Sequence, residues 1–225
     1  MTTAAPVGGP GRVVVFGAGG LGRELLQILR DIAASGLHAE CVAFAVDPGF
    51  APGGAIHGVP VREDIAAMLR RDPALGVVVA LGNPAARAAA VARLEAEGGP
   101  RFATLRHPAA SIGEQVSIGE GGMIFGHTSM TSDVTLGRHV LLNPGCTIAH
   151  DAVLEDFATL GPSVALAGGV HLGAGVEIGI GARVAPRVRI GRNAILGAGT
   201  VVIRDVAMGA TVVGVPGREL VRAQR

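Results

Sequence analysis

An aliphatic residue or methionine recurs at every sixth position in the second half of this chain. The run has sixteen members: Ile112, Ile118, Ile124, Met130, Leu136, Leu142, Ile148, Leu154, Leu160, Leu166, Leu172, Ile178, Val184, Ile190, Leu196 and Val202. Small or β-branched side chains stand two residues before most of them, and glycine often follows them directly. A period of six matches neither an α-helix, with about 3.6 residues per turn, nor the strict alternation of a strand.

Such a repeat predicts a parallel β-helix, in which each hexad supplies one short strand and one corner. Every sixth side chain then points inward. With three hexads in a coil, the run makes about five coils, which is enough for a continuous stacked core. We expect the glycines to lie at the corners, where a positive φ is needed. The period does not determine the handedness of the coil.

The length of 225 residues fits two modest domains better than one. We place them at residues 1–106 and 107–225, with the boundary near Arg106 to Ser111. Apolar residues make up 49% of the chain, yet glycine and charged residues interrupt each apolar stretch before it could span a membrane. Met1 to Gly11 lacks the basic start and apolar core of a signal peptide. We therefore expect a cytoplasmic protein without membrane insertion.

Charge argues against a nucleic-acid-binding protein, and the two cysteines argue against a disulfide or a cysteine nucleophile. The net charge is +1 and no basic cluster occurs, which argues against nucleic-acid binding. Cys41 lies in an expected strand and Cys146 at a small-residue position of the repeat. Both are expected to be reduced, buried packing residues rather than a disulfide or a nucleophile.

The first half alternates short apolar runs with segments of helical spacing. We expect strands at residues 13–16, 41–46 and 77–81 and helices at residues 23–34, 65–70 and 84–97, with Pro84 opening the last helix. This order predicts a parallel sheet with helical crossovers.

A glycine-rich turn, Gly17-Ala18-Gly19-Gly20-Leu21-Gly22, joins the first strand to the first helix. Gly17, Gly19 and Gly22 would let backbone amides approach a phosphate at the helix N-terminus. Asp47 ends the second strand, where a carboxylate accepts hydrogen bonds from a ribose or a base. A unit of about 100 residues resembles one mononucleotide-binding half of a dinucleotide fold, so a single nucleoside diphosphate fits best. Nicotinamide binding and a tight turn without any ligand remain alternatives.

Histidine is the natural general base near neutral pH, and the chain has seven histidines. His38 and His57 lie outside the repeat and show no pattern. His107 precedes Pro108 at the domain junction and is expected to be structural. Three more lie within the repeat but off its inward positions, so we expect them at solvated corners: His127, His139 and His171.

His150 differs because it stands two residues after an inward position and directly before Asp151. A carboxylate beside an imidazole can hold its tautomer and stabilise the imidazolium. On the residues alone, a surface His-Asp dipeptide is an alternative. A metal site is a second alternative, but ligands stacked on one face should differ by multiples of 18, and the spacings among the repeat's histidines do not. Ligands from two subunits would escape this test.

Several segments together resemble the bacterial sialic acid O-acetyltransferase and nucleotide-sugar N-acetyltransferase family. They are the hexads, the loop from Gly17 to Glu24, the junction His107-Pro108, the segment from Asn143 to Gly168 and the closing Gly214-Val215-Pro216-Gly217. The resemblance covers almost the whole chain. It implies a Rossmann-like domain for a nucleotide sugar, a left-handed β-helix that forms a homotrimer, and acetyl-CoA in a groove between neighbouring β-helices, with no metal.

The resemblance also implies roles for individual residues. His150 would be the general base, supported by Asp151, and Asn143 would contact the sugar or the reacting carbonyl. Substrate-binding residues would be Gly17, Gly19, Gly20, Leu21, Gly22 and Asp47. Acetyl-CoA would contact Thr159, Gly168, Ile180, Ala198 and Pro216. Two positions depart from the family's pattern, because Leu21 and Thr159 stand where histidine is common.

The leading hypothesis is transfer of acetyl from acetyl-CoA to an amino sugar on a nucleoside diphosphate, specifically a 4-amino-4,6-dideoxy sugar used in a surface polysaccharide. O-acetylation of a sialic-acid-type sugar is the close alternative. A non-catalytic nucleotide-sugar-binding scaffold is the alternative from another class. Because the repeat contains no insertion, the first domain must supply the acceptor site. The sequence leaves the nucleotide base open.

Overall fold

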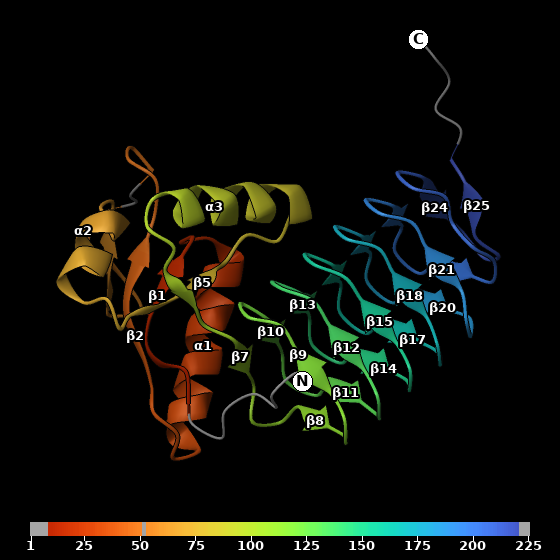
Figure 1. Cartoon of the computed structure of the whole chain (residues 1–225), viewed down its shortest axis with the longest axis horizontal. Coiled ribbons are helices and arrows are strands. Elements are labelled where there is room, and N and C mark those ends of the chain that lie inside the picture. Colours follow the sequence, from red (N-terminus) through yellow and green to blue (C-terminus); the bar gives the residue numbers. More distant parts are fainter. Residues whose placement is uncertain (1–8, 51–52, 221–225) are drawn as a thin grey trace, which may run out of the picture.

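The computed structural model describes residues 9–50 and 53–220, so the expectation for Met1 to Gly11 falls mainly outside the described residues. An α/β unit stands at one end of a β-helix, whose coils continue away from it toward the C-terminus (Figure 1). Within the described ranges, no helix has the length and apolar character needed to cross a membrane.

The α/β unit is built on one sheet with the strand order β3-β4-β2-β1-β5-β6. Its strands are β1 (Gly11–Phe16), β2 (Ala39–Ala45), β3 (Ala55–Ile56), β4 (Val59–Arg62), β5 (Gly76–Val79) and β6 (Arg101–Phe102). All neighbours pair in parallel except β3 and β4. The helices are α1 (Gly20–Ala34), α2 (Ile65–Arg71) and α3 (Pro84–Ala96). The expected crossovers are confirmed, while β3, β4 and β6 are too short to show a period.

The helices cover both faces of this sheet. Val13 and Val15 pack in one apolar cluster with the buried face of α1. Val14 and Phe16 pack in a second cluster, which includes side chains of α3. Successive side chains of a strand point to opposite faces, so the apolar run of β1 serves both clusters.

The repeat folds into three parallel sheets in the described part of the chain, and each sheet forms one face of the coil. Face 1 holds β7 (Leu105–Arg106), β10 (Met123–Ile124), β13 (Leu141–Leu142), β16 (Thr159–Leu160), β19 (Glu177–Ile178), β22 (Ile195–Leu196), β24 (Thr211–Val213) and the antiparallel β25 (Arg218–Glu219). Face 2 holds β8 (Ser111–Ile112), β11 (Ser129–Met130), β14 (Thr147–Ile148), β17 (Ala165–Leu166), β20 (Arg183–Val184) and β23 (Val201–Val202). Face 3 holds β9 (Ser117–Ile118), β12 (Thr135–Leu136), β15 (Val153–Leu154), β18 (His171–Leu172) and β21 (Arg189–Ile190).

The chain visits faces 1, 2 and 3 in turn, and paired strands such as β11 and β14 are 18 residues apart in register. We call the corner from face 1 to face 2 the first corner, that from face 2 to face 3 the second, and that from face 3 to face 1 the third. The sixteen repeat positions are buried, except that Ile112 and Ile118 in the first coil are half-buried against the same core. The predicted β-helix is confirmed.

The expectation that glycines after the inward residues adopt positive φ is wrong. The positive φ falls three residues after every inward residue except Val202. Many of these positions are not glycine: Gln115, His127, Asp133, His139, Asp151, Phe157, Ser163, Arg187 and Asn193. Gly173, which directly follows Leu172, has a different role. A Cβ there would lie 2.6 Å from the backbone nitrogen of Arg192 in the next coil. Close approach of successive coils, rather than φ, requires glycine there.

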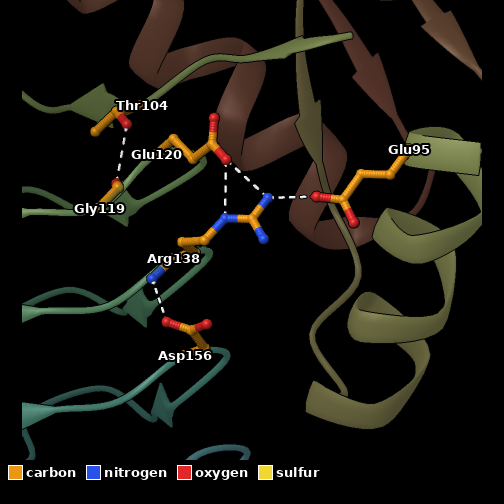
Figure 2. A network of polar contacts seen from close by, with 6 residues as sticks. All are labelled: Glu95, Thr104, Gly119, Glu120, Arg138 and Asp156. Atoms are coloured by element: carbon orange, nitrogen blue, oxygen red, sulfur yellow. Dashed lines mark hydrogen bonds and ion pairs between the residues drawn. The ribbon is translucent and has the colours of Figure 1, made fainter. Parts of the chain in front are cut away.

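The α/β unit covers the first coils of face 1. The chain passes from β6 to β7 between Phe102 and Leu105. Met123 and Leu141 point out of the β-helix, yet they are buried in the apolar cluster of α1. At the edge of this contact, the Arg138 guanidinium lies between Glu120 of the β-helix and Glu95 of α3 (Figure 2).

Arg87 of α3 is completely buried in the same interface. Its Nε donates to the carbonyl of His139 at 3.1 Å, and Nη1 donates to the carbonyls of Leu81 and Gly82 at 2.6 and 3.0 Å. Nη2 donates to the Phe157 carbonyl at 2.9 Å and to the Thr159 hydroxyl at 2.6 Å. All five N–H donors of the guanidinium are therefore satisfied across the interface.

His139 does not lie at a solvated corner, which corrects the expectation from the repeat. Its side chain is completely buried, stacked on Phe157 at 5.3 Å between ring centroids and edge-on to Phe102 at 4.7 Å. The third corner is covered there by the α/β unit. Burial, with the nearby charges of Arg138 and Arg87, lowers the pKa of His139 to about 4.

Candidate active site

His150 and Asp151 lie on the second corner of the β-helix, and both side chains are exposed. The His150 Nδ1 is 2.7 Å from Asp151 Oδ2. Asp151 has a φ of 59°, a left-handed conformation that aspartate tolerates better than most residues. If Nδ1 donates its proton to the carboxylate, Nε2 keeps a free lone pair that faces solvent. The corner geometry thus presents an oriented base.

Gly168 lies beside this imidazole in the next coil. A Cβ at Gly168 would lie 2.6 Å from both Cε1 and Nε2 of His150. The backbone of the two coils is joined here by a hydrogen bond from the Gly169 N–H to the His150 carbonyl, at 2.8 Å. Glycine therefore leaves the space that the ring occupies and keeps the approach to Nε2 open.

Three other predicted acetyl-CoA residues lie away from the second corner of the same chain. Ile180 and Ala198 are exposed on the first corner, one coil apart, and the Gly199 N–H donates to the Ile180 carbonyl at 2.8 Å. Pro216 is exposed in the turn after β24. Asn143 also lies on the first corner, where its Nδ2 donates to the Leu160 carbonyl at 2.7 Å. Oδ1 and the second N–H of that amide are left to meet a substrate.

Thr159 lies on neither of these corners. It is 8% exposed on face 1, and its hydroxyl accepts the hydrogen bond from Arg87. This environment assigns the side chain to the domain interface rather than to a ligand. We therefore leave Thr159 out of the acetyl-CoA site proposed below.

A cavity of about 750 Å³ opens at the carboxyl ends of β1, β2 and β5. Gly17, Gly19 and Asp47 line it, together with one side of α3. Ligand cavities of open parallel sheets lie at this edge. The predicted glycine loop and carboxylate are thus brought together in one concave site.

The remaining residues of the loop shape it in different ways. Gly20 and Gly22 lie in the first turn of α1, where the N–H groups of the first turn have no intrahelical acceptor. A Cβ at Gly22 would lie 2.1 Å from the Gly17 carbonyl oxygen, so glycine keeps the turn closed. The side chain of Leu21 is half-buried against the apolar cluster of α1. Its backbone and the exposed part of its side chain remain open to a ligand.

Two residues of the cavity could not be found from the sequence motifs. Arg93 of α3 places Nη1 at 2.6 Å from Asp47 Oδ1 and its guanidinium carbon 5.4 Å above the Phe16 ring. Phe50, which follows the second strand, is 77% exposed and lines the cavity. A single arginine in a helix and a single aromatic residue in a turn belong to no recognisable sequence motif, so neither could be predicted as a site residue.

The other histidines have structural partners or none that bears on catalysis. His107 accepts the Ala109 N–H at Nδ1 and contacts Asp31 of α1 through Nε2 at 3.1 Å, which confirms its structural role. His171 lies in strand β18 rather than at a solvated corner, which corrects the expectation from the repeat. It is half-buried, and its contact with Glu155 at 2.8 Å lowers the pKa of that carboxyl group. His127 is exposed. Over residues 9–50 and 53–220, no three histidine, cysteine or acidic side chains converge to hold a metal ion.

Comparison with known proteins agrees with this combination of fold and site. Residues 169–204 match the family described as bacterial transferase hexapeptide (six repeats). A perosamine N-acetyltransferase from Caulobacter crescentus, solved as a histidine-to-asparagine variant with CoA and GDP-perosamine, is 31% identical with a TM-score of 0.82, over 97% of this chain and 99% of that one. No curated protein matches the sequence.

Two further solved structures are similar over nearly their whole length. WeeI from Acinetobacter baumannii is 30% identical with a TM-score of 0.83, over 92% of this chain and 99% of that one. The acetyltransferase domain of PglB from Neisseria gonorrhoeae, solved with acetyl coenzyme A, is 27% identical with a TM-score of 0.81, over 93% and 98%.

Fold and site together define a hexapeptide-repeat acyltransferase, with a left-handed β-helix joined to a Rossmann-like domain. Within that class, the chain belongs to the nucleotide-sugar N-acetyltransferase family.

Proposed function

We propose that this protein transfers the acetyl group of acetyl-CoA to the amine of a nucleotide-linked 4-amino-4,6-dideoxy sugar. The observation that carries the proposal is the full-length similarity to an N-acetyltransferase solved with CoA and GDP-perosamine. The oriented His150-Asp151 pair supports it, because amide formation needs a base that takes the amine proton. The cavity beside the glycine loop supports it too, because it has the size of a small-molecule site.

The reaction follows from the geometry of His150. The sugar amine attacks the thioester carbonyl and gives one proton to Nε2, while Nδ1 donates to Asp151. The tetrahedral intermediate then collapses to the amide, and the CoA sulfur leaves with a proton from His150. Because Gly168 has no side chain, the thioester can approach Nε2. No covalent enzyme intermediate is required.

We assign residues 1–106 to the nucleotide sugar and residues 107–225 to acetyl transfer. The diphosphate would lie at the N-terminus of α1, against the backbone of Gly19, Gly20, Leu21 and Gly22. Acetyl-CoA would extend past Gly168, Ile180, Ala198 and Pro216. Both substrates are metabolites of the cytoplasm, where we propose that the enzyme works.

We further propose that the active enzyme is a homotrimer. The cavity is joined to the β-helix through Arg87, which contacts the third corner, whereas His150 lies on the second corner. The acetyl-CoA residues are likewise divided between the first and second corners. In a groove between two copies, one copy would supply the second corner with His150. The other copy would supply the cavity and the first corner.

The reaction is tested by measuring CoA thiol release with a panel of acceptors: nucleotide-linked 4-amino sugars on GDP, UDP and dTDP, a CMP-linked sialic-acid-type sugar, and no acceptor. We expect release only with a nucleotide-linked amino sugar, with the acetyl group found on the amine by mass spectrometry. Release with the sialic-acid-type sugar alone would replace N-acetylation by O-acetylation. Nucleotide-sugar binding without thiol release from any acceptor would favour the scaffold.

A further inference from the structure

The cavity at the sheet edge is lined by α3 on one side and by Phe50. One wall is the side of α3 that carries Ala86, Ala89 and Ala90, whose short side chains leave a smooth surface. Phe50 borders the cavity and is the most exposed large apolar side chain of the described residues, at 77%. An aromatic ring exposed to this extent beside a cavity is suited to stacking on a base.

A charged pair stands within the same cavity. Asp47 and Arg93 contact each other at 2.6 Å, and each side chain remains almost half exposed, at 45% and 43%. The ring of Phe16 supports the guanidinium from one side. The carboxylate keeps unused acceptor sites and the guanidinium keeps unused donors, because a single contact occupies only part of each group.

This pair offers acceptors and donors side by side, and the four bases differ in how they match it. Guanine presents two adjacent donors, N1–H and the exocyclic amine, next to the acceptor O6. Uracil and thymine present one N–H between two carbonyl oxygens, so one carbonyl would face the carboxylate. Cytosine and adenine present an amine next to a ring nitrogen without hydrogen. Only guanine gives a carboxylate two donors in a row.

We infer that the cavity selects guanine, so that the acceptor is a GDP-linked amino sugar. Asp47 accepts from N1–H and the exocyclic amine, Arg93 donates to O6, and Phe50 stacks on the ring. This inference rests on the proposed function for the presence of a nucleotide in this cavity, and it adds the base and the residues that select it.

The inference is tested by measuring dissociation constants of the full-length protein for GDP, UDP, dTDP, CDP and inosine diphosphate. Inosine diphosphate keeps O6 and N1–H but lacks the exocyclic amine. We expect GDP to bind at least about tenfold tighter than each of the others, since a hydrogen bond to a charged group is lost or replaced by repulsion. Phe50→Leu should weaken all five nucleotides, because stacking does not depend on the base.

Two variants separate base selection from a general effect. Asp47→Asn should bind GDP at least about tenfold more weakly and lose the preference for GDP over inosine diphosphate. Glu40→Gln, which removes an exposed carboxylate at the opposite end of β2, should bind like the unsubstituted protein. Thermal unfolding of each variant checks that the fold is unchanged.

Two outcomes would overturn the inference. Equal affinity for GDP and for UDP or dTDP would exclude guanine selection. If the protein then acetylates a UDP- or dTDP-linked amino sugar, the proposed function holds and only the inference about guanine is wrong. An equal loss of affinity for all five nucleotides in Asp47→Asn would assign the carboxylate to the ribose instead.

Discussion

Arg87 is the residue on which the relation between the two parts of the chain depends most. It is fully buried and contacts no carboxylate among residues 9–50 and 53–220. Burial lowers its pKa to about 10, so it remains charged at neutral pH. Its donors connect Leu81 and Gly82 at the cavity edge to Phe157 and Thr159 of the β-helix. A buried charge with five acceptors is stable only while every acceptor is in place.

Replacing Arg87 by methionine should destabilise the protein by about 3–5 kcal/mol, because five acceptors lose their donor in a buried site. Urea unfolding measures this change. Arg71→Met, on the exposed side of α2, is the matched control and should change stability by less than about 0.5 kcal/mol. Equal stability of the two variants would show that the buried contacts do not hold the interface.

His139 predicts a loss of stability in acid. Its pKa is lowered to about 4, below the value of about 6.5 for an unfolded chain. As the pH falls from 7 toward 4, the unfolded chain binds a proton before the folded one does, so up to about 3 kcal/mol of stability is lost. Arg138, Arg87, Glu95 and Asp156 are the charged groups that act on this ring.

The measurement is the free energy of unfolding at pH 7 and pH 4 for His139→Phe, which packs between Phe102 and Phe157 without a titrating group. We expect this variant to lose less stability on acidification than the unsubstituted protein. His127→Phe is the control, because His127 also has a positive φ but is exposed. The same pH dependence in all three proteins would contradict the account.

At the scale of the element, some features of the β-helical coil could be predicted from the repeat and others could not. The inward residues and the 18-residue register could be predicted, because burial permits few residue types at those positions. The sequence could not show which glycines are needed for a positive φ and which are needed for the close approach of the next coil, because the residue type is the same in both cases. Positions such as Asp151 and Asn193 take positive φ without glycine, whereas Gly173 is required by the neighbouring coil.

If only φ mattered, replacing a glycine of positive φ would cost more stability than replacing one of negative φ. We expect the reverse order for Gly181 and Gly173. Gly181 has a φ of 69° and open space around its Cβ position, so Gly181→Asn should cost less than about 1 kcal/mol. Gly173→Ala should cost more, about 2 kcal/mol or above, because its Cβ meets backbone atoms that cannot rotate away. Urea unfolding compares the pair, and a larger loss in Gly181→Asn would contradict this assignment.

At the scale of the whole molecule, the sequence predicted two parts but not how they meet. Met123 and Leu141 are apolar at outward positions where serine or threonine is frequent, but Val153 and Ile195 are apolar at equivalent positions outside the interface, so this pattern does not reveal the contact. The contacts of Arg87 with the β-helix join residues more than 50 positions apart, which no period reveals. Thr159, which the resemblance places at acetyl-CoA, accepts a hydrogen bond from Arg87 in this interface.

The proposed trimer predicts complementation between two inactive variants. His150→Asn removes the base, and Ala89→Trp fills the cavity of the α/β unit. If each site combines the cavity of one copy with the His150 of another, co-expressed variants should regain about a quarter of the activity, from random mixing of subunits. No recovery in mixed trimers, with both variants folded, would place the whole site in one chain.

The central claim is that His150 catalyses acetyl transfer to a nucleotide-linked amine. It is tested most directly by the rate of acetylated product formation, followed by mass spectrometry, from acetyl-CoA and a GDP-linked 4-amino-4,6-dideoxy sugar. We expect turnover by the unsubstituted protein and a loss of about 10²- to 10⁴-fold in kcat for His150→Asn, with both substrates still bound. An unchanged kcat in that variant would contradict it.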